Sequence, residues 1–411
     1  MRIHASREKH LDQHCNFKQG TNHTMNLRNA AFSMLKMGER LLRGSVPVEG
    51  PSLDSLDEFL VLFYDQALGT AIHATPLFEA LRKARPSARI TVASSGIALE
   101  VIRNNPFVDR VIETPNVYKH TLAAARVLRR TYRPGKIFCI ITLNGSSRSR
   151  VALLAFLAGK SVRAGGTLAP ALYHLPVDTS GAVSQIGKNL LLLTALGIQQ
   201  SPIEPRLFFT QDDVNYVRTL LGLDNGLCKG IAMLVTRVSG GQPTTWPQDR
   251  FVAVARHLME THGYRIVLPG TASDTYDLNM LAKRISDGAI SLAGKTTVAQ
   301  LAVLCALSDI AITLDTGGFH VARTQALPLV VIAPAWQQSE EWMPLGKPWA
   351  RILKGPWFPA PPPSHYAIEE ISVGEVIAAA DELVSKFPPS PQAREARIAR
   401  SLVPQSSEIQ P

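Results

Sequence analysis

The segment that most constrains the fold is residues 309–334, in which two apolar runs flank a short turn and a helical stretch. The first run, 310–314, ends at the polar and glycine-containing sequence of 315–318. The second run begins at Leu329, after a stretch of helical character through His320. This order is typical of a strand, a tight turn, a helix and then the next strand of a parallel sheet.

The turn at the start of the expected helix has the composition of an anion-binding site. It contains Asp315, Thr316, Gly317 and Gly318. The free amides of a helix N-terminus and the positive end of its dipole attract anions, and glycines let a phosphate approach the backbone. Small residues also occur at strand-to-helix turns for structural reasons, so the turn alone does not identify a ligand.

Strand-like and helix-like segments alternate along the chain in two series. The first series predicts strands at 59–64, 88–94, 109–113 and 136–143 and helices at 73–85, 96–103, 118–131 and 147–157. The second predicts strands at 230–236, 264–269, 290–293, 309–314 and 329–334 and helices at 248–262, 274–286, 297–306 and 318–326. Two such series, with a break near 200–228, predict an α/β fold of two doubly wound sheets that face a cleft.

The two series also predict how the chain divides. We expect an N-terminal extension, two Rossmann-like domains, a C-terminal helix of amphipathic spacing at 373–386, and a disordered tail. The predicted limits of these parts are 1–56, 57–205, 228–372, 373–387 and 388–411. Ligands of such folds bind at the carboxyl ends of the strands, where the glycine turns at 68–69 and 316–318 fall. No G-x-G-x-x-G sequence follows either first strand, which argues against a dehydrogenase.

Four motifs occur in order within roughly residues 57–385. They are Asp-Thr-Gly-x-x-His-x-Ala at 315–322, a strand with a glycine loop at 59–76, Trp-Pro-Gln-Asp-Arg-Phe at 246–251, and Leu-Ala-Gly-Lys-Thr at 292–296. Their residues and spacing resemble those of glycosyltransferase family 9, the ADP-heptose–lipopolysaccharide heptosyltransferase family. The resemblance implies the GT-B architecture, in which one Rossmann-like domain binds the acceptor and the other binds the nucleotide sugar.

The resemblance also implies the donor site and the reaction. Asp315, Thr316, Gly317, Gly318 and His320 match the family's contacts to the pyrophosphate and the donor sugar, position by position. The implied reaction is an inverting transfer with no metal and no other cofactor, with a nucleotide sugar, ADP-heptose in that family, as donor. Such a transfer needs a general base at the acceptor hydroxyl and positive potential around the departing diphosphate. A histidine that only caps the helix turn is the alternative role for His320.

Two expected charged residues are absent from the matching positions. The glycine loop of the family reads Gly-Asp, and that aspartate is its presumed base, whereas Thr70 follows Gly69 here. The family also carries a phosphate-binding lysine two residues before the Trp-Pro pair, where this chain has Thr244. Arg237, at the end of the first strand of the second series, is a candidate replacement for that lysine.

Four explanations of the missing aspartate remain open. Asp65, at the end of the first strand, or His73, one turn into the next helix, takes over as the base. Alternatively the chain has lost transfer activity and keeps only binding of glycan or nucleotide sugar, or an unidentified residue supplies the base. On the acceptor side we also expect Gly69 and Thr70, together with Asn144 and Arg148 after the fourth strand.

Charge is unevenly distributed between the two halves. Residues 56–200 contain 17 Lys and Arg against 8 Asp and Glu, whereas residues 201–387 contain 15 against 18. A basic first half favours an anionic partner, and a phosphorylated or carboxylated glycolipid, or the anionic leaflet that holds it, fits. Nucleic acid is not expected, because no recognised binding motif occurs and aromatic residues make up only 7% of the chain. A solvated basic face is the alternative.

Cysteine usage and the N-terminal sequence favour a cytoplasmic protein. Four scattered cysteines show no metal or disulfide spacing, which is typical of a reducing compartment. No apolar run approaches the length of about 18 residues that a membrane span needs. Residues 1–24 are polar, and we expect them to be disordered; translation starts either at Met1 or at Met25. Residues 25–43 form a basic amphipathic stretch. This stretch is suited to peripheral contact with the inner membrane or to simple packing.

We therefore expect a cytoplasmic GT-B glycosyltransferase that transfers a sugar to a membrane-linked glycan such as the lipopolysaccharide core. The alternative from another class is a catalytically silent homologue that binds glycan or nucleotide sugar. A UDP-sugar epimerase or another GT-B enzyme is a third possibility, which the motif at 315–322 disfavours.

Overall fold

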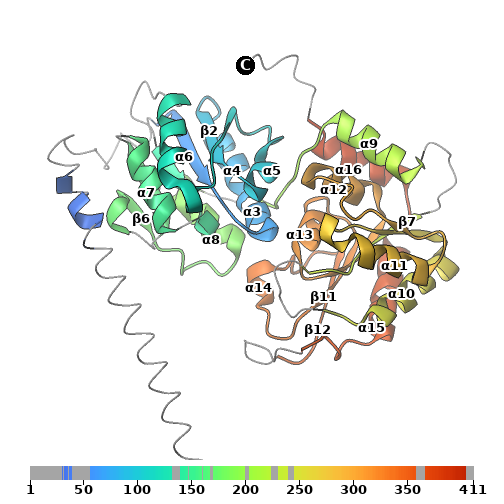
Figure 1. Cartoon of the computed structure of the whole chain (residues 1–411). Coiled ribbons are helices and arrows are strands. Elements are labelled where there is room, and N and C mark those ends of the chain that lie inside the picture. The colour runs from blue at the N-terminus through green and yellow to red at the C-terminus, as the bar shows by residue number, and fades with distance from the viewer. Residues whose placement is uncertain are drawn as a thin grey trace, which may run out of the picture.

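Two parallel β-sheets, one from each half of the chain, lie side by side with helices around them (Figure 1). The computed structural model describes residues 30, 32–35, 37–38, 56–131, 139–146, 148–159, 161–166, 170–199, 203–223, 230–238, 245–357 and 366–403. Within these residues each sheet has six strands. The arrangement confirms the α/β fold of two doubly wound sheets.

The first sheet has the strand order β3-β2-β1-β4-β5-β6. Its strands are β1 (Glu58–Phe63), β2 (Arg89–Ser94), β3 (Arg110–Glu113), β4 (Cys139–Thr142), β5 (Val162–Gly166) and β6 (Leu175–Val177). Its helices are α3 (Leu68–Ala74), α4 (Pro76–Ala84), α5 (Ile97–Ile102), α6 (Val117–Thr131), α7 (Ser149–Ala158) and α8 (Gln185–Thr194). The single helix predicted at 73–85 is instead α3 followed by α4, because Pro76 occupies the first turn of a new helix, where its missing N–H costs nothing.

The second sheet has the strand order β12-β11-β10-β7-β8-β9. Its strands are β7 (Gly230–Val235), β8 (Tyr264–Leu268), β9 (Ile290–Ser291), β10 (Ile310–Leu314), β11 (Leu329–Ala333) and β12 (Ala350–Lys354). The helices of this half are α9 (Gln211–Leu221), α10 (Gln248–His262), α11 (Thr275–Ile285), α12 (Val298–Leu307), α13 (Gly317–Thr324), α14 (Ser339–Trp342), α15 (Val373–Lys386) and α16 (Pro391–Ser401). The helix predicted at 373–386 is α15.

Both sheets have the same topology. Counted from the first strand of each, the order is 3-2-1-4-5-6, which is that of a Rossmann fold. The order reverses between β1 and β4 in the first sheet and between β7 and β10 in the second, and both pairs are parallel. The crevice at such a reversal, outside the carboxyl ends of the strands, is where ligands of these folds bind.

The sequence pattern did not predict several edge elements. Strand β5 carries an arginine and two glycines, and β6 is only three residues long with a proline at its centre, so neither reads as an apolar run. Arg163 of β5 is nonetheless fully buried, and its guanidinium donates to Leu172 O at 2.7 Å. Helix α9 lies in the interval 200–228, where we expected only a break, and it packs on α12. The predicted limits 57–205 and 228–372 remain predictions.

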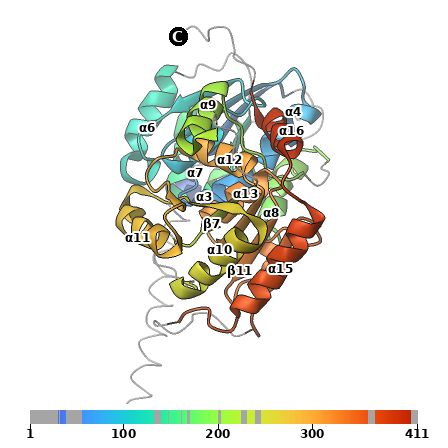
Figure 2. The same ribbon diagram turned by 90° about the vertical axis from the view of Figure 1, so that its right-hand side faces the viewer.

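The prediction of a disordered tail at 388–411 is wrong for its first part, which forms α16. The helix looks polar in sequence because it carries three arginines, but two of them bind backbone carbonyl groups of other elements. Arg397 donates to Ala306 O and Ser308 O at the end of α12, and Arg400 donates to Thr324 O. In Figure 2, α16 lies against α12, and α15 lies beside α10.

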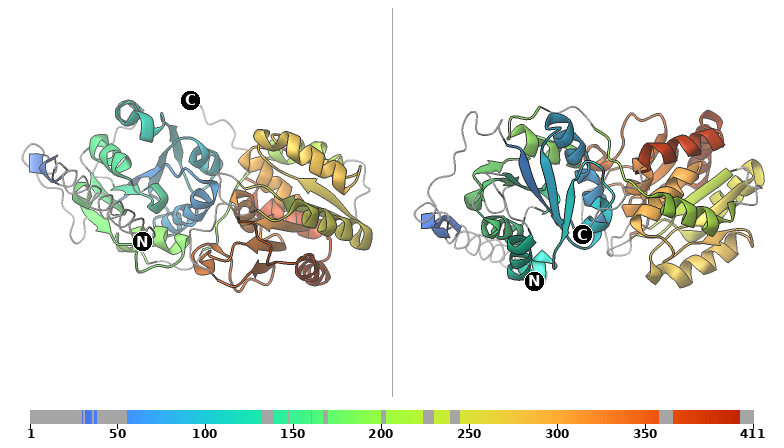
Figure 3. Two further views of the ribbon diagram at one scale, coloured as in Figure 1. Left: turned by 60° about the horizontal axis from the view of Figure 1, so that its bottom comes forward. Right: turned by 90° about the horizontal axis from the view of Figure 1, so that it is seen from above.

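The two halves share contacts along the faces that meet between them (Figure 3). The largest buried apolar cluster contains side chains of both sheets, such as Phe63 and Met233. Polar contacts add to it: Lys188 and Gln185 of α8 bind the same carboxylate oxygen of Glu341 in α14, at 2.6 and 2.5 Å. Helices α3 and α13 also contact each other, which brings the two predicted glycine turns together.

The described part of the N-terminal extension is a short helical stretch within residues 30–38. Phe32 packs against Ala152, Leu172 and Tyr173 of the first half. Exposed apolar side chains on the same stretch are Met34, Leu35 and Met37. None of the helices in the described residues is both long enough and apolar enough to span a membrane.

The attachment of α16 can be tested through its buried ion pair. Arg394 contacts both carboxylate oxygens of Asp309, at 3.0 and 2.5 Å, and the Asp309 side chain is only 3% exposed. Arg394→Met leaves this carboxylate buried without its partner, so we expect the free energy of unfolding in urea to fall by about 3–5 kcal/mol. Arg351→Met removes a partly exposed pair with Glu382 and should cost about 0–1 kcal/mol. Equal losses in the two variants would contradict this role of α16.

Candidate active site

The residues predicted for function lie after the four strands that flank the two reversals of strand order. Asp65 follows β1, Asn144 and Arg148 follow β4, Arg237 follows β7, and Asp315 follows β10. The carboxyl ends of neighbouring parallel strands lie at one edge of a sheet, so each pair belongs to one crevice. The fold thus places the candidate residues where a Rossmann sheet binds ligands.

Asp65 is a buried carboxylate with one oxygen free for another group. Its side chain is 2% exposed, and its Oδ2 accepts a hydrogen bond from Ser146 Oγ at 2.7 Å. Ser146 Oγ in turn accepts from Tyr64 N at 2.7 Å, which fixes the hydroxyl. Within the described residues Asp65 Oδ1 has no hydrogen-bond partner. This oxygen lies against Gly145, where a Cβ atom would be only 1.7 Å from it.

The surroundings of Asp65 raise the affinity of its carboxylate for a proton. Burial raises the pKa of Asp65 to about 6, against the opposing effects of the hydrogen bond from Ser146, the nearby Thr70 hydroxyl and the charge of Arg148. Arg148 lies over the ring of Tyr118, 5.4 Å from its centroid. Burial and the charge of Asp65 together raise the pKa of Tyr118 to about 12, so this phenol stays neutral. A carboxylate with a pKa near 6 is ionised at neutral pH and is a better base than an exposed aspartate.

The glycine turn after Asp65 is in direct contact with the second half of the chain. The Thr70 hydroxyl donates to Ala67 O at 2.9 Å, so its proton is not directed at Asp65. A Cβ atom on Gly69 would lie 2.5 Å from His320 Cδ2, and one on Gly317 would lie 3.0 Å from the side chain of Leu68. A side chain at position 69 would therefore displace the His320 ring, and one at position 317 would crowd Leu68, so glycine at both positions favours the close approach of α3 and α13.

His73 lies in a buried cluster between the two halves. Its side chain is 1% exposed, and its ring contacts those of His320 and Trp342, with centroids 4.7 and 5.3 Å away. Arg323 donates to His73 Nε2 at 3.4 Å and to Glu204 at 3.0 Å. Burial, with the nearby His320 ring and the charge of Arg323, holds the pKa of His73 well below its usual range. A weakly basic, enclosed imidazole is a poor candidate for the general base.

The predicted donor turn forms the N-terminus of α13. The Thr316 hydroxyl caps the helix by accepting from Gly318 N at 3.3 Å. A Cβ atom on Gly318 would lie 2.9 Å from Val235 at the end of β7, so α13 also packs closely on its own sheet. Burial and the charge of Arg323 lower the pKa of His320 to about 3. His320 is therefore neutral at physiological pH, so it can bind a phosphate or a sugar by a hydrogen bond but not by an opposite charge.

Asp315 is held at the base of this turn. Its Oδ2 accepts a hydrogen bond from Gln337 Nε2, and Lys354 donates to the backbone carbonyl of Gln337. Burial raises the pKa of Asp315 to about 7. Because the carboxyl is easily protonated, it can donate a hydrogen bond to a ligand oxygen as well as accept one.

The remaining predicted residues have more local partners. Arg237 forms ion pairs with Asp277 at 3.0 Å and Asp274 at 3.5 Å, so its charge is already matched by two carboxylates. Asn144 is bound on three sides, by Asn189, Gln185 and Thr179. Thr244 lies outside the described residues. The sequence analysis did not predict four residues that contact the candidate site residues. Ser146, Arg323, Gln337 and Trp342 lie outside the motifs, and no pattern in the sequence links them to those motifs.

The geometry of this site and its comparison with known proteins agree. Two Rossmann-like domains whose candidate ligand turns meet between them define the GT-B class of glycosyltransferases. The sequence model of glycosyltransferase family 9 (heptosyltransferase) matches residues 126–347, more than half of the chain. The chain belongs to glycosyltransferase family 9 and is a glycosyltransferase. Lipopolysaccharide heptosyltransferase 2 of Escherichia coli (strain K12) is 23% identical over 286 residues, which are 64% of this chain and 79% of that protein.

Solved structures share the fold at low sequence identity. A family 9 glycosyl transferase from Veillonella parvula DSM 2008 superposes with a TM-score of 0.71 at 21% identity, covering 80% of this chain and 98% of the other. The ADP-heptose lipopolysaccharide heptosyltransferase II of E. coli gives a TM-score of 0.65 at 19% identity, covering 80% and 99%. The E. coli heptosyltransferase WaaC with ADP gives 0.60 at 15%, also covering 80% and 99%. These likenesses confirm the GT-B fold.

The close approach of α3 and α13 can be tested by a double-mutant cycle. We expect Gly69→Ala to lower the free energy of unfolding by about 1–3 kcal/mol, because the methyl group displaces the His320 ring. In a His320→Ala background the same substitution has room, so the two changes should be coupled by about 0.5–3 kcal/mol.

Gly374→Ala is the matched control for this cycle. Gly374 is also the second residue of its helix, and a Cβ atom there would have no neighbour closer than 3.9 Å. It should therefore be neutral or stabilising. Additive effects of Gly69→Ala and His320→Ala would show that the two residues are not in contact.

Proposed function

We propose that this glycosyltransferase transfers a heptose from ADP-heptose to a lipopolysaccharide core or a related glycan, by an inverting mechanism without a metal ion. Asp65 acts as the general base in place of the aspartate that Thr70 replaces. The proton of the acceptor hydroxyl goes to Asp65, the acceptor oxygen forms a bond to the anomeric carbon, and the bond from that carbon to the nucleotide diphosphate breaks. The positive N-terminus of α13 stabilises the departing diphosphate.

The observation that carries the proposal is the state of Asp65. It is a buried carboxylate with a pKa near 6 and a free oxygen, directly before the turn whose Gly69 touches His320 of the donor helix. A general base needs ionisation at the working pH and reach to the acceptor proton. His73 is less suited, because its ring is enclosed by His320, Trp342 and Arg323.

The choice of donor and acceptor rests on the relatives and on charge. The relatives include a lipopolysaccharide heptosyltransferase and structures of heptosyltransferases, one of them with ADP. The excess of 17 Lys and Arg over 8 Asp and Glu in residues 56–200 suits an anionic glycolipid. We place the reaction at the cytoplasmic face of the inner membrane, where the exposed Met34, Leu35 and Met37 can make peripheral contact.

A catalytically silent family member is the second candidate function. Two observations favour it: Thr70 stands at the position of the usual base, and Arg237, the candidate substitute for the missing lysine, is paired with Asp274 and Asp277. Such a protein would bind nucleotide sugar or glycan without transferring the sugar. Separate measurements of donor binding and of sugar transfer distinguish the two functions.

Donor binding is tested first, by thermal shift with ADP-, UDP- and GDP-sugars. We expect an ADP-sugar to stabilise the protein by about 2.7 kcal/mol when present at 100 times its Kd. Gly317→Val should weaken this binding at least about tenfold, because a side chain at the helix N-terminus blocks the phosphate. Since that side chain also meets the Cβ, Cγ and Cδ2 atoms of Leu68, the measurement is repeated in Gly317→Val/Leu68→Gly, which removes all three of these atoms. Full affinity in the double variant would remove the phosphate assignment.

Catalysis by Asp65 is tested by the pH dependence of transfer. A base must be deprotonated, so we expect kcat/KM to fall as pH decreases through about 6, the pKa of Asp65. Asp65→Asn keeps the shape and the acceptor for Ser146 but cannot take a proton. It should lower kcat by on the order of 10²–10⁴-fold with donor affinity unchanged. If Asp65→Asn transferred sugar at the wild-type rate, with kcat/KM falling over the same pH range, Asp65 would not be the base.

Thr70→Asp separates a relocated base from a lost one. If Asp65 carries the reaction, restoring an aspartate at position 70 should give no large gain in transfer over wild type. A large gain from an inactive wild type would indicate a scaffold that has lost only its base. No transfer by wild type or Thr70→Asp with any donor that binds would favour the silent homologue.

A further inference from the structure

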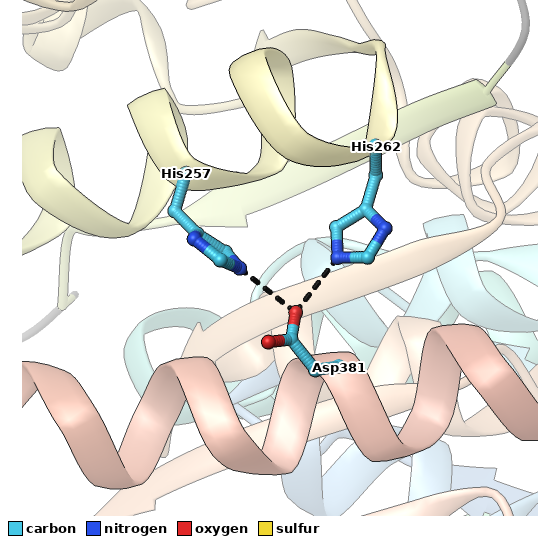
Figure 4. Close-up of side chains that lie close together, drawn as sticks. All are labelled: His257, His262 and Asp381. Atoms are coloured by element: carbon cyan, nitrogen blue, oxygen red, sulfur yellow. Dashed lines mark hydrogen bonds and ion pairs between the residues drawn. The ribbon is translucent and has the colours of Figure 1, made fainter.

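Two histidines and an aspartate converge on the surface of the second half of the chain. His257 and His262 both belong to α10, and Asp381 belongs to α15, which packs beside it (Figure 4). The Nε2 atoms of both imidazoles lie near the same oxygen, Asp381 Oδ1, at 2.8 and 2.7 Å. The two rings are nearly perpendicular, with centroids 5.6 Å apart. Among the described residues this is the group of three side chains whose ligand atoms all lie within 4.8 Å of one another.

We propose that His257, His262 and Asp381 form a binding site for a divalent transition-metal ion of the zinc type. Two imidazoles and one carboxylate are ligands that Zn²⁺ prefers, with a fourth position left for water. Bonds of about 2.0–2.2 Å to a tetrahedral ion place its ligand atoms about 3.4 Å apart. The present spacings, from 2.7 Å to at most 4.8 Å, bracket that value, so rotation of the side chains is enough to admit the ion.

The second ring nitrogen of His257 has a partner that suits a metal ligand. His257 Nε2 donates to the Asp381 carboxylate at 2.8 Å, and Thr261 Oγ1 lies 3.4 Å from His257 Nδ1. A cation bound at Nε2 would take the place of the Nε2 proton, and the ring would then carry its proton on Nδ1, where the Thr261 hydroxyl can accept it. Ligating histidines are usually oriented in this way, by a hydrogen bond from the second ring nitrogen. The three side chains are 22% to 40% exposed, which leaves a path for the ion and for a water ligand.

The location of the site indicates a structural role. His262 is the last residue of α10 and directly precedes Gly263 and β8, so it lies at the amino edge of the sheet. The candidate donor turn at 315–318 lies at the opposite, carboxyl edge. The ion would therefore join α15 to α10 and take no part in sugar transfer. No local sequence pattern predicts this site, because 119 residues separate Asp381 from His262.

The test measures Zn²⁺ binding to the full-length protein after treatment with EDTA and dialysis. Because residues 1–24 contain further histidines and a cysteine, the informative quantity is the difference between wild type and matched variants. The variants are His257→Gln/His262→Gln and Asp381→Asn, which keeps an oxygen that can accept both hydrogen bonds. The control is His120→Gln, which removes an exposed histidine of α6.

We expect wild type and His120→Gln to bind one more equivalent of Zn²⁺ than the cluster variants. Loss of a ligand should lower the affinity of that site for Zn²⁺ at least about 100-fold. This loss exceeds the about 10–100-fold loss that follows removal of an outer-shell partner. Zn²⁺ should raise the Tm of wild type, EDTA should reverse the rise, and Asp381→Asn should not respond. If all four proteins bound the same number of Zn²⁺ equivalents and showed the same Tm shift, the proposal would be overturned. The cluster would then be only a set of hydrogen bonds that links α10 to α15.

Co²⁺ provides a measurement that does not depend on the variants folding. Bound to wild type at one equivalent, it should show the strong visible absorption of a four-coordinate ion, and one equivalent of Zn²⁺ should displace it. Absence of this absorption in wild type would equally overturn the proposal.

Discussion

The close approach of α3 and α13 is the contact on which the candidate site depends. The two helices follow the first strand of one sheet and the fourth strand of the other, so their N-terminal turns emerge at the two reversals of strand order. Gly69 and Gly317 have no side chain, which lets the turns touch at His320 and Leu68. A larger residue at position 69 would displace the His320 ring, and one at position 317 would crowd Leu68, so either change would disturb the contact between the turn that follows Asp65 and the turn that follows Asp315. The candidate residues of the two halves form one site only if this contact between α3 and α13 forms.

Contacts around this junction keep the two halves in register. Arg323 links His73 of the first half, the Trp342 carbonyl of the second and Glu204 of the connecting segment. Arg323 is 7% exposed, so its hydrogen bonds compete little with water and are stronger than those of a surface arginine. His73, a candidate base from sequence alone, is better explained as part of this junction. Its lowered pKa keeps a second positive charge away from Arg323.

The sequence predicted the parts of the fold that have a regular pattern and missed those that depend on distant partners. Central strands such as β1 and β10 are uninterrupted apolar runs, so they were predicted within a residue or two of their limits. Strand β5 and helix α16 carry arginines whose backbone acceptors come from other elements, and no local pattern reveals them. In the candidate site, the motifs directed attention to the turn after β10 and to the end of β1. They could not show that Ser146 orders Asp65 or that Gln337 binds Asp315, because both partners come from later segments.

The buried Asp65 carboxylate destabilises the folded state when it is ionised, and this cost is an argument for its role as a base. Unfolded, this carboxyl ionises near its ordinary pKa of 3.8, whereas in the fold it keeps its proton up to about 6. Between these values the folded state binds more protons, so stability falls as pH rises through this window. Above it, the ionised group costs about 3 kcal/mol. An asparagine would keep the Ser146 hydrogen bond without this cost. Functional sites are where chains retain such costs, so a destabilising ionised carboxylate just before the turn that contacts α13 is better explained by proton transfer than by packing.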